Sequence, residues 1–255
     1  DLARGNPSSY FKIINNIDIS PSQYNLLQDA SGSWKPIGTT SVPFKAVNGA
    51  GFSISGIYIN NSSGYYQGLF GVTSGDVKNL GISSGTVLGY FETGGIVGRT
   101  SGGTVTNCYN AATIIAVGAS SQATAGIVGY NLAGVVTYCF NAGAVMATGA
   151  SSRQIAGVVG SKNATLTDSY NIGAITATGS GSSYVGGVVG YIGTSTSTVA
   201  RCHNSGTVIA TGASSSYIGG IGNGYVSDSY NTGNVSGNTY VGGITNYNSN
   251  VPNCY

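Results

Sequence analysis

The stretch Gly94-Gly95-Ile96-Val97-Gly98 decides the fold, because its pattern of a small residue, a glycine, two apolar residues and a glycine returns about every thirty residues. Full copies lie at residues 125–129, 156–160 and 186–190, and incomplete copies lie at residues 68–71, 219–222 and 242–244. A fixed period of this length is typical of stacked repeats, in which each repeat buries its apolar face against its neighbours. The sequence therefore predicts a solenoid.

The composition narrows the classes of partner. Charged residues make up 6% of the chain, against roughly a quarter in ordinary soluble domains. The net charge of +2 comes without a basic cluster, which argues against nucleic acid as a partner. The apolar runs are too short to cross a membrane, so no membrane insertion is expected. A surface of hydroxyls, amides and phenols favours an extracellular or cell-surface location.

Residues 95–125 show what one coil contains. Three short apolar segments, at residues 95–98, 104–110 and 113–117, are separated by turns and have no helical period. A loop rich in glycine, alanine and serine is expected at residues 119–124. These features predict an all-β, right-handed parallel β-helix (β-solenoid) with about 30 residues and three short strands per coil.

We expect one domain over residues 1–255. Residues 1–65 lack the signature and are predicted to form an N-terminal cap and irregular entry coils, in which Trp34 and Phe44 fill the open end. Residues 66–255 are predicted to be regular repeats, the last one incomplete. Because the sequence reaches Tyr255 in mid-repeat, we expect either that the natural protein continues or that this end stacks on another molecule.

Alignment of the repeats predicts two interior columns. The first is aliphatic throughout, and the second, three residues later, is small or apolar. Cys108 and Cys139 are one repeat apart, and theirs is the only credible disulfide; otherwise buried thiols are expected, and the spacing is not that of a zinc site. The columns are Val77, Val105, Val136, Leu166, Val199, Val226 and Val251, and then Leu80, Cys108, Cys139, Ser169, Cys202, Ser229 and Cys254.

The next two columns are predicted to hold aromatic rings outside and asparagines at a turn. Adjacent strand residues face opposite ways, so a ring beside an interior cysteine points outward. Such rings either shield the sheet by stacking on each other or bind sugar faces or a protein partner. Stacked asparagine amides would hydrogen-bond along the stack as a structural ladder. The columns are Tyr109, Phe140, Tyr170, His203, Tyr230 and Tyr255, and then Asn110, Asn141, Asn171, Asn204 and Asn231.

Asp168, Arg201 and Asp228 share one repeat position in three successive coils. One interpretation is a lyase or hydrolase site, because polysaccharide-cleaving β-helices mount carboxylates and arginines in this stacked fashion. The other is a structural ion ladder, which we favour because no further acid joins the three residues. His203 has no acid to orient it and is expected to replace tyrosine in the aromatic column. No catalytic residue, metal or cofactor is therefore predicted.

Several motifs together resemble the GLUG-repeat family of bacterial surface proteins. They are residues 34–38 (Trp-Lys-Pro-Ile-Gly), Phe44, residues 68–71 (Gly-Leu-Phe-Gly), residues 77–80 (Val-Lys-Asn-Leu) and the repeated Ser-Tyr-Asn-x-Gly-x-Val, cleanest at residues 229–235. The resemblance covers nearly the entire chain. It implies a β-solenoid in large secreted or wall-attached proteins, including adhesin-like molecules and extensions ahead of IgA-protease-type peptidases. The single histidine excludes an H-E-x-x-H zinc site within this chain.

The leading functional expectation is a non-catalytic extracellular structural or adhesive β-solenoid module of a bacterial surface protein. One alternative is a self-stacking subunit of an extracellular filament, and another is a polysaccharide-binding or polysaccharide-cleaving β-helix. The corresponding partners are the protein itself, end to end, or host or surface glycans or proteins.

Overall fold

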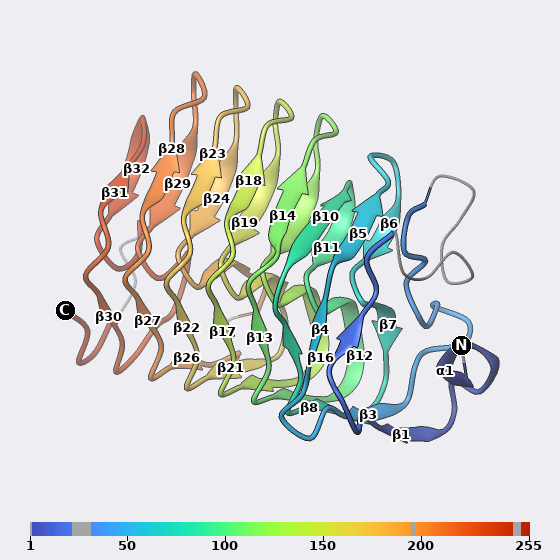
Figure 1. Ribbon diagram of the computed structural model, residues 1–255. Coiled ribbons are helices and arrows are strands. Elements are labelled where there is room, and N and C mark those ends of the chain that lie inside the picture. The colour runs from blue at the N-terminus through green and yellow to red at the C-terminus, as the bar shows by residue number, and fades with distance from the viewer. Residues whose placement is uncertain (1, 22–31, 195–196, 247–250) are drawn as a thin grey trace.

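A computed structural model describes residues 2–21, 32–194, 197–246 and 251–255. After a short helix α1 (Leu2–Gly5), the described chain winds into coils whose strands pair in parallel with those of the coils before and after. The coils follow one another along one axis from the N-terminal to the C-terminal end (Figure 1). The predicted all-β parallel solenoid with about thirty residues per coil is confirmed.

The first sheet, ten-stranded within the described residues, contains the aliphatic interior column. Val77, Val105, Val136, Leu166 and Val199 pair in register and are at most 2% exposed. The strands are β1 (Tyr10–Lys12), β3 (Ala46–Asn48), β7 (Phe70–Thr73), β8 (Val77–Lys78), β12 (Val97–Thr106), β16 (Val128–Thr137), β20 (Val159–Lys162), β21 (Thr165–Thr167), β25 (Val189–Ile192) and β26 (Val199–Ala200).

In the regular coils, the second sheet follows the first after a tight corner. The corner residue, such as Asn107 (φ 52°) or Asp168 (φ 51°), adopts the left-handed conformation, which asparagine and aspartate tolerate better than most residues. The strands are β2 (Ile17–Asp18), β4 (Ser53–Ser55), β9 (Gly81–Ile82), β13 (Tyr109–Asn110), β17 (Phe140–Asn141), β22 (Tyr170–Asn171), β27 (His203–Asn204) and β30 (Tyr230–Asn231).

The third and fourth sheets run to and from the row of tips at the top of Figure 1. The third contains β5 (Ile57–Asn60), β10 (Gly85–Gly89), β14 (Thr113–Ala116), β18 (Val145–Ala147), β23 (Ile175–Ala177), β28 (Val208–Ala210) and β31 (Val235–Ser236). The fourth contains β6 (Tyr65–Gln67), β11 (Phe91–Gly94), β15 (Gln122–Ala125), β19 (Arg153–Ala156), β24 (Ser183–Gly186), β29 (Ser216–Gly219) and β32 (Thr239–Gly242).

The fourth sheet corrects one expectation. The three predicted segments of the type repeat all carry strands, but β15 begins at Gln122, inside the loop expected over residues 119–124. Ala123 has a φ of 55° and lies between the paired residues Gln122 and Thr124. This left-handed residue breaks the alternation of inward and outward residues, and this is why the sequence did not reveal a strand there.

Regular coiling also begins earlier than residue 66. Val47 pairs with Val77, Ile54 pairs with Ile82, and Ile57 pairs with Gly85, so the ladders already include β3, β4 and β5. Trp34 and Phe44 are buried as expected, and the Phe44 ring stacks between those of Phe11 and Phe70. These early coils bury large apolar side chains, and residues 34–44 carry no copy of the glycine signature.

The core explains why the signature requires a glycine. A Cβ on Gly157 would lie 2.3 Å from both the Asn171 side chain and the Gly187 carbonyl oxygen. Gly95, Gly126, Gly187 and Gly220 make the same close approach to an asparagine and to the next coil. The glycine column and the asparagine column therefore pack directly on each other, and no side chain fits between them.

Candidate functional site

The aromatic column forms one continuous stack on the second sheet. Successive rings from Tyr109 to Tyr255 lie nearly parallel, with centroids 4.6–5.5 Å apart. The lower face of Tyr109 lies against Gly81, where a Cβ would come within 2.0 Å of the ring. Tyr255 is 81% exposed, while the other rings are half-buried. Each ring from Tyr109 to Tyr230 therefore has both faces covered and presents only its edge to a partner.

His203 lies within this stack between Tyr170 and Tyr230. Burial lowers the pKa of its imidazole. The ring is therefore largely neutral at pH 7 and packs as an aromatic spacer.

The asparagine column is a hydrogen-bonded ladder. Each side-chain amide from Asn110 to Asn204 donates to the Oδ1 of the next asparagine, at 2.8–2.9 Å. Each also donates to a carbonyl two residues on in its own turn, as Asn171 does to Gly173. Asn110, Asn141, Asn171 and Asn204 are fully buried, and Asn231 is partly exposed. The ladder thus satisfies turn carbonyls that water cannot reach.

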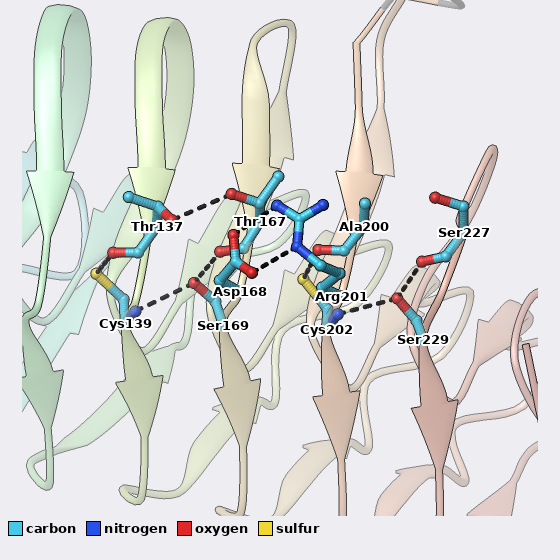
Figure 2. A network of polar contacts seen from close by, with 10 residues as sticks. All are labelled: Thr137, Cys139, Thr167, Asp168, Ser169, Ala200, Arg201, Cys202, Ser227 and Ser229. Atoms are coloured by element: carbon cyan, nitrogen blue, oxygen red, sulfur yellow. Dashed lines mark hydrogen bonds and ion pairs between the residues drawn. The ribbon is translucent and has the colours of Figure 1, made fainter.

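The charged column contains one ion pair among the described residues rather than a ladder of three. Arg201 donates to both carboxylate oxygens of Asp168, at 2.6 and 2.7 Å (Figure 2). Asp228 instead accepts a hydrogen bond from Asn253, at 2.8 Å. The hydrogen bonds from Arg201 lower the pKa of Asp168, which favours an ionised carboxylate and disfavours a proton donor.

The cysteines are free thiols, so the Cys108–Cys139 bridge is not formed. Burial raises the pKa of Cys202 to about 12 and raises that of Cys139 further above its ordinary value, which keeps both thiols neutral. Figure 2 shows how serine fits the same column: Ser169 Oγ accepts from the Cys139 amide at 3.1 Å, and Ser229 Oγ accepts from the Cys202 amide at 3.0 Å.

The interior also holds a lysine that the sequence did not single out. Lys162 is fully buried in β20, and its Nζ donates to the Ala164 carbonyl oxygen at 2.7 Å. Burial lowers its pKa to about 7. Its main-chain neighbour in the preceding coil is Asn131, which accepts a hydrogen bond from Thr100.

A second aromatic surface lies where the fourth sheet meets the first. We call it the tyrosine groove. One side is a column of the fourth sheet whose residues all have positive φ, here called the left-handed column, and the other is an outward column of the first sheet. The left-handed column is Tyr66, Glu92, Ala123, Gln154, Tyr184, Tyr217 and Tyr240, and the facing column is Val72, Arg99, Tyr130, Ser161 and Tyr191.

Contacts across the groove join the two columns. The Arg99 guanidinium binds the Glu92 carboxylate and lies 4.9 Å from the Tyr66 ring centroid and 5.4 Å from that of Tyr130. Further along, Tyr184 meets Tyr191 edge-on at 5.1 Å. Tyr184, Tyr217 and Tyr240 stack at 5.0 Å spacing.

Glu92 is the buried acid of the groove, with its side chain 3% exposed. Burial raises its pKa above the ordinary 4.5, whereas the hydrogen bonds and charge of Arg99 lower it. Because Arg99 binds this carboxylate, the pair is electrically neutral. The ion pair also holds the Arg99 guanidinium between the Tyr66 and Tyr130 rings.

Two hollows open along the groove. The first, about 370 Å³, is lined by Phe91, Glu92, Gln122, Ala123, Tyr130, Gln154, Ser161, Asn163, Tyr191 and Gly193. The second, about 270 Å³, continues past Tyr191 and is lined by Tyr184, Ile192, Tyr217, Asn223, Gly224 and Asn246. The sequence offered one signal for this surface, the recurring tyrosine of Ser183-Tyr184-Val185, Ser216-Tyr217-Ile218 and Thr239-Tyr240-Val241.

Replacing Arg99 by leucine should destabilise the chain by about 2 kcal/mol at neutral pH, because Glu92 is left buried without a partner but borders an open hollow. Without Arg99, burial alone acts on Glu92, so its pKa is higher in the folded than in the unfolded chain. The folded chain then binds more protons, and stability falls as pH rises through that pKa. The deficit, measured by thermal unfolding, should therefore shrink toward about pH 4.

The matched control is Arg153→Leu, which removes an exposed arginine from β19. It should change stability by less than about 0.5 kcal/mol at any pH. An Arg99→Leu deficit that does not depend on pH would contradict the role given to Glu92.

The four sheets and the buried ladders define the chain as a parallel β-solenoid, in which each coil packs against the coils before and after it. Residues 89–115 match the family described as the GLUG motif. This match confirms the predicted resemblance over residues 89–115, and the chain is a β-solenoid that contains a GLUG motif there.

Two known proteins are similar to it. A segment of 77 residues, 29% of this chain, is 35% identical to a protein of Evansella cellulosilytica provisionally described as a Gly-rich membrane protein. That segment spans 8% of the relative. A crystal structure from Bacteroides ovatus, provisionally described as an immunoglobulin A1 protease, superposes with a TM-score of 0.63 at 20% identity. The match covers 96% of this chain and 68% of that one, and at this identity it shows the fold alone.

In the part of the chain that the structure describes, no helix has the length and apolarity needed to span a membrane. Over the same residues, no three His, Cys, Asp or Glu side chains gather as metal ligands would.

Proposed function

We propose that this chain is a non-catalytic extracellular module of a bacterial surface protein, with a structural and an adhesive role. The observation that carries the proposal is the continuity of the side-chain ladders. Asparagines, aromatic rings and aliphatic residues each stack from coil to coil, which favours a stiff arm over a mobile catalytic centre.

The ionisable groups support a binding role over a catalytic one. The Asp168 carboxylate is held by Arg201, and the Glu92 carboxylate is held by Arg99. A general acid and a general base need two groups with pKa values pushed apart and open to one substrate. These two carboxylates instead each face a guanidinium.

The description of one similar protein supports an extracellular location. The Evansella relative is described as a membrane protein, and the chain matches only a small part of it. A stiff solenoid joined to an anchored protein would carry a binding surface away from the cell. The tyrosine groove is the surface we assign to adhesion, because it is hollowed and lined mainly by half-buried amide and phenol groups.

Intact cells that make the natural protein should be labelled by antibodies against this chain without permeabilisation. Beads coated with the purified chain should be retained on immobilised mucin, bacterial cell walls or cultured epithelial cells more than beads coated with albumin. Labelling only after permeabilisation, or retention no better than albumin on every surface, would contradict the proposal.

The same purified chain also tests the catalytic alternative. Incubation with soluble polysaccharides should release no reducing ends. Release that is lost in Glu92→Gln or Asp168→Ala would replace the adhesive proposal by a glycan-cleaving one.

A further inference from the structure

The first hollow of the tyrosine groove lies between two rings of one column. Tyr130, Ser161 and Tyr191 occupy the same position in three successive coils. Rungs of a parallel sheet lie about 4.8 Å apart, so the two tyrosines stand about 9.6 Å apart, with the small serine between them. Filling this position with serine rather than tyrosine is what leaves the hollow of about 370 Å³.

In the described part of the chain, no aromatic ring or guanidinium stacks between Tyr130 and Tyr191. The only ring contacts of Tyr130 and Tyr191 among the described residues are Arg99 and Tyr184 respectively. Asn163 donates to the Tyr130 hydroxyl at 2.6 Å and holds that ring in place. The gap is therefore bounded by two fixed aromatic walls.

The width of the gap selects the kind of ring that fits. Contact between carbon atoms is best at about 3.5–4.0 Å, so a flat ring touching both walls needs only about 7–8 Å between them. A puckered saturated ring is thicker and fills a two-rung gap of about 9.6 Å better. The geometry favours a pyranose ring over an aromatic side chain of a peptide.

The polar lining indicates a neutral ligand rich in hydroxyl groups. Gln122 and Gln154 border the hollow, and over the described part of the chain their side-chain amides make no hydrogen bond. Ser161 lies between the walls, and the one acid, Glu92, is neutralised by Arg99. Free amides and hydroxyls in a groove without net charge complement sugar hydroxyls.

We propose that this hollow binds one neutral hexopyranose residue of a glycan, with its ring held between Tyr130 and Tyr191 and its hydroxyls bound by Gln122 and Gln154. The glycan continues along the groove into the second hollow, beside Tyr217. This inference rests on the proposed adhesive function and names its ligand class.

The decisive variant is Ser161→Tyr. Tyrosine already occupies this position in the coils before and after, so the fold should accept it, and the new ring would fill the gap. The probes are cellohexaose, maltohexaose, mannohexaose and chitohexaose, titrated into the purified chain by calorimetry. At least one should bind the unaltered chain, and Ser161→Tyr should weaken that binding about tenfold or more.

A second variant tests the site independently, in case Ser161→Tyr loses binding because it misfolds. Tyr191→Ser removes one wall by copying the serine of the preceding coil and should weaken binding of the same probe by a similar factor. The matched control is Tyr138→Asn, which removes a 63% exposed tyrosine from the corner column, where Asn107 and Asn253 show that asparagine is accepted. It should leave binding unchanged, with unfolding midpoints measured for all variants.

Binding that survives both groove variants would overturn the site, and failure of all four probes to bind would overturn the neutral-hexose ligand. The bead assay separates these results from the proposed function. Beads that adhere normally with Ser161→Tyr would show that the chain is adhesive through another surface. Beads that never adhere would show that the adhesive function itself is wrong.

Discussion

Replacing Gly157 by alanine is expected to lower the free energy of unfolding by about 4 kcal/mol or more. The new methyl group would lie 2.3 Å from the Asn171 side chain and 2.3 Å from the Gly187 carbonyl oxygen. Overpacking usually costs about 1–3 kcal/mol because flexible side chains move aside. Here one obstacle is backbone and the other is held by hydrogen bonds, so two coils would have to separate. Urea denaturation followed by far-ultraviolet circular dichroism measures the loss.

The control is Gly243→Ala, at the equivalent signature position of a later coil. A Cβ on Gly243 meets no atom of the described residues within 4 Å, and its backbone does not require glycine. The substitution should change stability by less than about 1 kcal/mol, within the range of ordinary surface changes and glycine-to-alanine effects. Equal losses at the two positions would mean that the glycine is selected by backbone conformation and not by the contact with the asparagine ladder.

Replacing Asn171 by alanine is expected to cost about 4 kcal/mol. The side chain is fully buried; it accepts a hydrogen bond from Asn141 and donates to both Asn204 and Gly173, each at 2.8 Å. Its removal strands one donor and two acceptors, and each stranded buried group costs about 1–3 kcal/mol. The same urea titration measures the change.

Asn107→Gly provides the matched control for the ladder. Asn107 also makes a side-chain hydrogen bond to an asparagine of the preceding coil, Asn79 Oδ1 at 2.8 Å, but it is exposed. Glycine preserves its positive φ, and water replaces the lost amide, so the loss should stay below about 1 kcal/mol. If the exposed and buried asparagines proved equally important, burial would not be the source of the ladder's contribution.

The sequence predicted the columns that run along the axis. The alignment of Val105 with Val136 and of Asn110 with Asn141 follows from the repeat length alone, because in-register parallel coils place equivalent residues one rung apart. It did not predict β15, because the left-handed conformation of Ala123 interrupts the alternation that identifies a strand. It also placed the start of regular coiling too late, because Val47 and Ile54 lie in coils without the glycine signature.

The charged column shows a second limit of the alignment. The equivalence of Asp168, Arg201 and Asp228 is real, since all three share the corner conformation. Yet Arg201 turns toward Asp168, and Asp228 accepts from Asn253. The alignment of a column gives the positions of the backbones. It does not determine whether a long side chain bonds to the preceding coil or to the following one.

The sequence by itself determined the solenoid, the coil length and the aliphatic, cysteine, aromatic and asparagine columns, because the repeat period carries that information directly. Only the tertiary structure decided which columns face each other. Glu92 meets Arg99 because a residue of positive φ in each coil turns one column outward where the fourth sheet meets the first, and Tyr130 lies two coils from Tyr191 in the facing column. The angle between sheets and the direction of a side chain on a left-handed residue are properties of the coil's cross-section, which no repeat period encodes.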